Sequence, residues 1–172
     1  MVTIWSFCAF AFFLVPFYMS VLDTDNMFIM SLALALAEII SSVICISFIH
    51  GRDLRRLLSF YYLITCLGAL FIMTFKMIYK GNSEIPEAIG FLVLYVGIMT
   101  TFDLVYLIVN ELFPTIYLAT AYGFCNTVGR GITILSPLVA NEPNPIPMTV
   151  LAVFSAICIL LPYGLIKYNK QS

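Results

Sequence analysis

Charged residues are scarce in this chain of 172 residues, since Asp, Glu, Lys and Arg together make up only 10% of it. Soluble domains of ordinary composition carry roughly a quarter charged residues. Hydrophobic residues make up 62% of the chain, so the composition excludes an ordinary soluble domain and predicts an integral membrane protein. The formal net charge of −1 and the scattered Lys and Arg residues exclude a basic surface for nucleic acid.

The chain also lacks the residue combinations that metal sites, disulfide frameworks and common active sites require. The single histidine, His50, has no second ligand nearby in sequence, so we expect no metal. No His pair, serine elbow, phosphate loop or pair of acids at catalytic spacing is present, so we expect neither an enzyme nor a cofactor. The cysteines form no C-x-x-C pair and lie within apolar runs, which is typical of small buried residues: Cys8, Cys45, Cys66, Cys125 and Cys158.

Long apolar runs are what the chain does contain. A helix needs about 20 apolar residues to cross the hydrocarbon core of a bilayer. Runs of that length, bounded by charges, Pro or Gly, predict an all-α polytopic membrane protein that forms one domain over residues 1–172, with six spans at about 2–22, 27–49, 57–75, 88–109, 117–140 and 148–165.

The connections between these spans predict an orientation, because cytosolic loops are enriched in Lys and Arg. One side holds Arg52, Arg55, Arg56, Lys167 and Lys170, whereas the other holds only Lys76 and Lys80. Both termini are therefore expected on the cytosolic side, or on the matrix side of a mitochondrion. The first span lacks the positive start of a secretory signal and the chain has no N-x-[ST] sequon, which is compatible with the mitochondrial inner membrane.

Three ionisable residues fall inside the predicted spans: Glu38, Asp103 and Arg130. Each costs roughly 2.5 to 3.5 kcal/mol at a helix centre, so each is expected to face protein or a wet cavity. Glu38 lies in the small-residue run "LALALAEIISS", and we interpret it as a residue that bonds one helix to another in preference to a substrate contact.

Arg130 shares a helical face with other polar and aromatic residues, at spacings of three and four: Tyr122, Asn126, Thr133 and Pro137. A similar stripe of residues lies along the fourth span: Tyr95, Met99, Asp103, Tyr106 and Asn110. The two stripes either line a substrate pathway, or Asp103 and Arg130 pair and hold their helices together with no ligand. The next face of the fifth span carries small residues that would let another helix approach closely: Ala119, Gly123, Thr127 and Gly131.

Several short segments resemble organic ion transporters of the major facilitator superfamily. The segment "NELFPT" at 110–115, followed by "GFCNTVGRGITILSPLV", is similar to the E-L-Y-P-T segment and the helix after it. "LAEII" around Glu38 resembles an acidic position of the eighth helix, and "RDLRR" at 52–56 resembles the turn between the eighth and ninth helices. The resemblance implies that the six spans correspond to helices seven to twelve. It also implies that Arg130 lines a central cavity suited to organic anions or zwitterions, and that Glu38, Arg52, Arg55, Arg56, Glu111 and Pro114 are motif residues.

The chain departs from this family where the cytosolic gate is built. The glycine of the turn motif is Leu54, its leading acid is Gly51, and the arginine expected after E-L-Y-P-T is Leu118. The terminal P-E-T is replaced by Pro162, Tyr163 and Gly164, and Asp103 stands where the family has a small polar residue. The resemblance therefore implies a half-transporter whose gate has been lost.

Two functions remain open from these observations. Carriers of this superfamily move two six-helix halves about a site at their interface, so one half alone has a cavity wall but no cavity. We expect an accessory or structural subunit of a larger membrane complex in preference to an autonomous carrier. The alternative is the working half of a split or homodimeric secondary transporter, completed by another six-helix half. The chain starts with Met1 directly before a span, which favours a separate half, and a fragment of a longer product remains the alternative.

Overall fold

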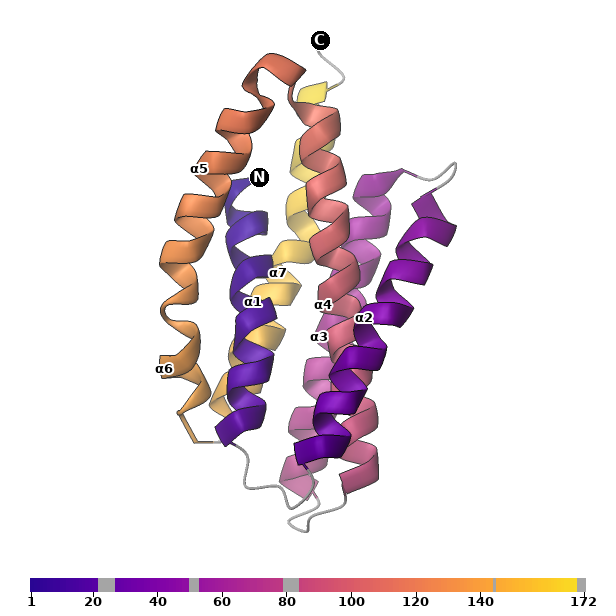
Figure 1. Cartoon of the computed structure of the whole chain (residues 1–172), viewed down its shortest axis with the longest axis vertical. Coiled ribbons are helices and arrows are strands. Elements are labelled where there is room, and N and C mark those ends of the chain that lie inside the picture. The colour runs from indigo at the N-terminus through magenta and orange to yellow at the C-terminus, as the bar shows by residue number, and fades with distance from the viewer. Residues whose placement is uncertain (22–26, 50–52, 79–83, 144, 170–172) are drawn as a thin grey trace.

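The structure, a computed structural model, describes residues 1–21, 27–49, 53–78, 84–143 and 145–169. Within these ranges all regular structure is α-helical (Figure 1). The helices are α1 (Val2–Val21), α2 (Met27–Ile49), α3 (Leu54–Ile78), α4 (Glu84–Leu112), α5 (Thr115–Thr133), α6 (Ser136–Ala140) and α7 (Ile146–Asn169). The predictions for His50, Arg52, Lys80 and Lys170 lie outside the described residues.

Five helices of the described chain are long and apolar enough to cross a membrane: α1, α2, α3, α4 and α7. The protein is therefore an all-helical, membrane-embedded chain. The predicted first and second spans agree closely with α1 and α2, whereas α3, α4 and α7 extend beyond the apolar runs. These helices continue through polar residues at their ends, because polar residues also form α-helix. Pro162 lies inside α7, which is tolerated in membrane helices.

The fifth predicted span, 117–140, is wrong as a single helix. It is divided into α5 and α6 by a turn at Ile134 and Leu135. Proline at position 137 has no N–H to donate to the carbonyl of Thr133, and its ring would clash with that carbonyl, so α5 ends four residues earlier. Neither α5 nor α6 is among the helices apolar enough to cross a membrane.

The long helices run roughly parallel to one another in an up-and-down bundle (Figure 1). In this view α5, α1, α4 and α2 form a front layer, and α3 and α7 run behind them. Helix α1 packs extensively on α5, α2 packs on α4, and α3 packs on both α4 and α7. Both chain ends lie toward the same end of the bundle as the α2–α3 and α4–α5 connections.

The closest helix crossing joins α3 and α4, and glycine on both helices permits it. A Cβ atom at Gly68 would lie 2.9 Å from the Cα of Leu94, and one at Gly97 would lie 2.6 Å from Oγ1 of Thr65. Around this crossing the core is mostly apolar, with Tyr62, Ile72 and Leu94 almost completely buried. Small residues at such contacts allow van der Waals packing between helices in lipid.

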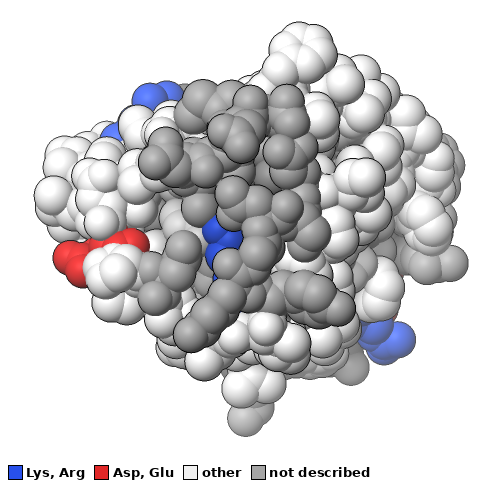
Figure 2. All heavy atoms as spheres, turned by 90° about the horizontal axis from the view of Figure 1, so that it is seen from below, with Lys and Arg blue, Asp and Glu red and all other residues white. Residues whose placement is uncertain are grey.

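A charged contact closes the opposite end of the bundle from the chain termini. Nζ of Lys76 in α3 lies 2.7 Å from Oε1 of Glu87 in α4, and the two side chains are only 20% and 11% exposed. The same ammonium lies 5.4 Å from the ring centroid of Tyr18 in α1. Seen from this end, a basic group is visible near the centre of the face, and an acidic group lies at its edge (Figure 2). This ion pair therefore joins α3 and α4 where their connection begins and ends.

Candidate functional site

A groove of about 250 Å³ lies where α1, α4 and α5 meet. Its polar lining comes from Asn126, Arg130 and Thr133 of α5, which share one helical face as predicted. Its aromatic lining comes from α1 and α4: Trp5, Phe12, Phe13, Phe102 and Tyr106. The groove therefore combines one guanidinium with an aromatic wall.

Three rings from three helices pack together beside this groove, and two of them, Trp5 and Tyr106, line it. The centroid of Trp5 lies 4.5 Å from that of Tyr106 and 5.6 Å from that of Tyr122, and the two tyrosine rings stack at 5.5 Å. These separations are typical of favourable aromatic pairs. Trp5 is only 2% exposed, so its ring is a fixed part of the wall.

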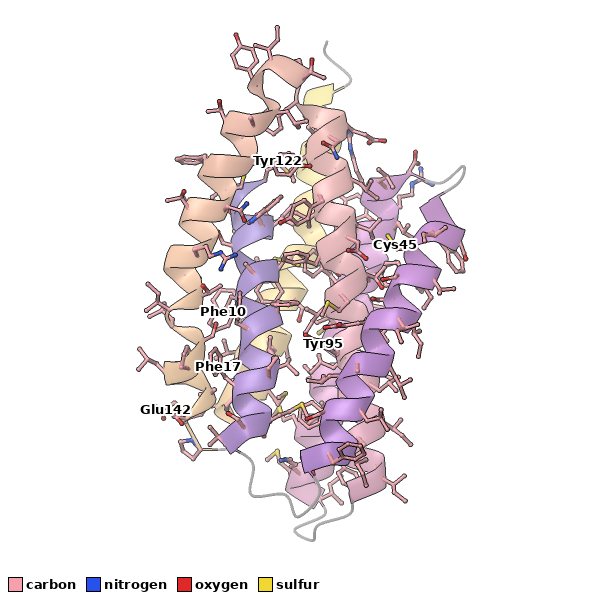
Figure 3. The ribbon with its side chains drawn as sticks, in the orientation of Figure 1. Phe10, Phe17, Cys45, Tyr95, Tyr122 and Glu142 are labelled. Atoms are coloured by element: carbon pink, nitrogen blue, oxygen red, sulfur yellow. The ribbon has the colours of Figure 1, made fainter. Side chains whose placement is uncertain are left out.

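Tyr122 is bonded to α4 through its hydroxyl, and its place in a substrate pathway stays a prediction. Its hydroxyl lies 2.9 Å from the backbone carbonyl of Tyr106 and 3.0 Å from Oδ1 of Asn110, and it donates its proton to these α4 acceptors. Tyr122 is the side chain of α5 labelled near α4 in Figure 3. Its hydroxyl therefore joins α5 to α4 above the groove.

Arg130 is exposed, and its charge is not paired within the described part of the chain. Its Cζ lies 6.0 Å from the ring centroid of Phe13, at the limit of a cation–π contact. The ion pairs between described residues are Arg56 with Asp53 and Lys76 with Glu87. The predicted pairing of Asp103 with Arg130 is therefore absent, since α1 stands between much of α5 and α4.

Three further candidate residues do not line the groove: Asp103 and Tyr95 of α4, and Glu38 of α2. Asp103 is half-buried on α4 and Tyr95 is 3% exposed. Tyr95 stacks on Phe12 with 6.3 Å between ring centroids, so it supports a groove residue from behind. Glu38 is exposed on α2, and its backbone carbonyl accepts hydrogen bonds from Ser41 and Ser42.

Four of the motif residues that the resemblance implies lie at helix ends: Arg55, Arg56, Glu111 and Pro114. Arg55 is half-buried in the first turn of α3. Arg56 is exposed, and its Nε lies 3.3 Å from Oδ2 of Asp53. Glu111 is exposed in the last turn of α4. Pro114, with φ −62° and ψ 152°, is the N-cap residue of α5, and its extended backbone separates α4 from α5.

The predicted small-residue face of α5 does not contact another helix in the described chain. Gly123 and Gly131 have no atom within 4 Å of an added Cβ, and Ala119 and Thr127 are exposed. The close approach to α1 instead occurs at Gly129, where a Cβ would lie 3.1 Å from Cδ1 of Trp5. The face that packs is thus rotated from the one predicted.

Sequence reasoning missed the contribution of α1 to the groove. Trp5, Ala9, Phe12 and Phe13 follow helical spacing, so they share a face, but an aromatic face in an apolar run is indistinguishable from ordinary packing until its neighbours are known. The one tryptophan of the chain, Trp5, was the available signal for this aromatic face.

No protein-family model, curated protein or solved structure matches the chain.

Proposed function

We propose that this chain is one six-helix lobe of a larger membrane assembly, where it serves as an accessory or structural subunit and not as an autonomous carrier. The observation that carries the proposal is the exposed Arg130, which has no ion pair among the described residues. A guanidinium in the hydrocarbon zone is costly unless water or a polar partner surrounds it. A second membrane protein that covers the α1–α4–α5 face would supply that surrounding.

The packing order supports the likeness to a half of a major facilitator superfamily transporter. Such halves consist of two three-helix repeats of inverted topology. Here α1, α2 and α3 correspond to α4, α5 with α6, and α7. The middle helix of each set packs against the first helix of the other set, α5 on α1 and α2 on α4, and the third helices α3 and α7 pack together. This reciprocal order is the one that an internal repeat predicts.

The exposed edges of the front layer support a covering partner. In the apolar segment of α2 only 22% of the residues are buried, compared with 67% in that of α1. In α5 the buried residues are Cys125 and Gly129. In Figure 1 these two helices lie at the two sides of the front layer, with α1 and α4 between them, so a second lobe that docks over this layer would cover both of them.

A second function is favoured by the chemistry of the groove: half of a split or homodimeric carrier for organic anions or zwitterions. A guanidinium can hold a carboxylate with two parallel hydrogen bonds, and Asn126 and Thr133 add polar groups beside it. The groove's 250 Å³ is below the roughly 300 to 1,000 Å³ of ordinary ligand pockets. A second lobe would have to complete such a site.

For orientation we propose that both termini face the cytosol or the mitochondrial matrix. The support is the excess of Lys and Arg in the connections on that side and the placement of both chain ends toward one end of the bundle. The mitochondrial inner membrane is the compartment we propose to examine first.

Purification from the native membrane in mild detergent separates the two functions. A stoichiometric set of unrelated subunits supports the accessory role, whereas a matching six-helix half or a homodimer supports the carrier. An Arg130→Ala variant then tests the site. It should weaken assembly in a subunit and abolish anion uptake in a carrier, while Glu142→Ala, which removes an exposed charge outside the groove, should change neither. Unchanged assembly and uptake in the Arg130→Ala variant would remove the arginine from both roles.

A further inference from the structure

A second cavity, of about 600 Å³, lies between α1, α5, α6 and α7. It shares no lining residue with the Arg130 groove, because it uses different faces of α1 and α5. The residues near its opening are large, apolar and exposed, including Leu135, Phe154 and Ile157. In a membrane-embedded chain such a crevice opens toward lipid.

One polar atom in this crevice has no partner. Ser6 is 3% exposed, lines the crevice, and its Oγ forms no hydrogen bond in the described structure. Serine hydroxyls in membrane helices usually donate to a carbonyl three or four residues earlier. Ser47, Ser59 and Ser155 do so in this chain. A buried hydroxyl without a partner is destabilising, so the exception at Ser6 indicates an acceptor supplied from outside the chain.

The depth of Ser6 and the shape of the walls restrict the class of occupant. Ser6 lies four residues after the start of α1, about 6 Å along the helix, in the half of the bundle that holds the N-terminus. The crevice extends from Val128 to Val139 along α5 and α6, a distance of roughly 16 Å at helical rise. The rings of Phe7, Phe10 and Phe154 line the crevice, so part of the wall is aromatic.

We propose that this crevice binds a lipid of the sterol class. A rigid, flat and apolar ring system fits an apolar crevice with aromatic walls, and a single hydroxyl matches a single unpaired hydroxyl. The sterol oxygen would accept the Ser6 proton, with the rings extending between α5 and α7 along the crevice. A phospholipid chain is the competing occupant, but it is flexible and offers no flat surface to the rings. The proposal does not depend on the function of the Arg130 groove.

Photolabelling tests the proposal. The full chain, in phosphatidylcholine nanodiscs, is exposed to a photoreactive sterol, with unlabelled sterol as competitor, and the labelled peptides are identified by mass spectrometry. We expect labelling of α1 and α7 that saturates and is competed. Ser6→Ala should weaken competition about fivefold, the net worth of one hydrogen bond. Ser20→Ala, on the same helix at an exposed position with its own backbone bond, is the matched control.

A second pair of variants tests the volume of the crevice. Val128→Phe fills it and should abolish competed labelling, whereas Val153→Phe, at an exposed position of α7 outside the crevice, should leave labelling unchanged. If Val128→Phe does not fold, the two serine variants still decide. Equal labelling of Ser6→Ala and Ser20→Ala would overturn the proposal. So would labelling of the crevice by a photoreactive phosphatidylcholine that excess sterol does not displace.

Discussion

The α3–α4 crossing gives the sharpest prediction, because the helices meet at glycines with no space to spare. In Gly97→Ala the new Cβ would lie 2.6 Å from Oγ1 of Thr65, although carbon contacts are optimal at about 3.5 to 4.0 Å. In Gly68→Ala it would lie 2.9 Å from a backbone atom, the Cα of Leu94, which no side-chain rotation can relieve. Each variant must therefore push the helices apart by about 1 Å.

We expect each alanine to destabilise the protein by roughly 1 to 2 kcal/mol. Overpacking costs about 1 to 3 kcal/mol, and alanine returns up to about 1 kcal/mol of helix propensity. The corresponding fall in Tm is roughly 2 to 8 °C for a chain of this length. The two contacts share one crossing, so the double variant should cost less than the sum of the single ones.

The buried thiols provide the assay. Cys8, Cys45, Cys125 and Cys158 are buried and free, so a thiol-reactive fluorophore reports unfolding on heating in detergent. Gly123→Ala is the control, because an added Cβ there has nothing within 4 Å, and its Tm should be unchanged or slightly higher. If Gly68→Ala and Gly97→Ala unfold at the same temperature as Gly123→Ala, the close α3–α4 crossing is wrong.

Three further predictions concern contacts between helices. Replacing Lys76 or Glu87 by glutamine should each cost about 2 kcal/mol, because the remaining partner is left charged and mostly buried; the double variant should recover part of the loss in a double-mutant cycle. Tyr122→Phe should lose about 1 kcal/mol, one hydrogen bond, while the stacked ring stays in place; a Tyr122→Phe variant as stable as the unchanged protein would show that the hydroxyl contributes nothing. Pro137→Ala should join α5 to α6, because the restored N–H can bond to the carbonyl of Thr133. Hydrogen–deuterium exchange should then show protection of the amides at 134–137, and unchanged fast exchange there would contradict the assigned cause of the break.

Hydropathy predicted the position of most helices but not their lengths. It detects the hydrocarbon core alone, so the polar ends of α3, near Arg55, and of α4, near Glu87, were left out of the predicted spans. The break after Thr133 was predictable from the sequence, because Pro137 has no N–H for the carbonyl four residues earlier. The prediction placed Pro137 on a helical face and overlooked this missing donor. Which helices pack together was not predictable, because long apolar helices offer many similar faces.

The site shows the same division between local pattern and tertiary arrangement. The polar face of α5 was predicted by its spacing, and Asn126, Arg130 and Thr133 do line one groove. Asp103 was wrong as the group opposite Arg130, because helical spacing alone does not show which side chains lie across from a face. In place of Asp103, the aromatic face of α1, including Trp5 and Phe13, approaches the arginine.

The weak packing of α5 connects the fold to the proposed partner. Helix α5 is less apolar than its neighbours and buries only Cys125 and Gly129, and its attachment to α4 depends on the Tyr122 hydroxyl. Since helices in lipid associate through packing and interhelical hydrogen bonds, α5 is the long helix that this lobe holds least firmly. A partner that covers the exposed small-residue face and Arg130 would stabilise α5 first. Amide exchange in α5 should therefore slow on assembly more than exchange in α3, whose contacts already lie inside the lobe.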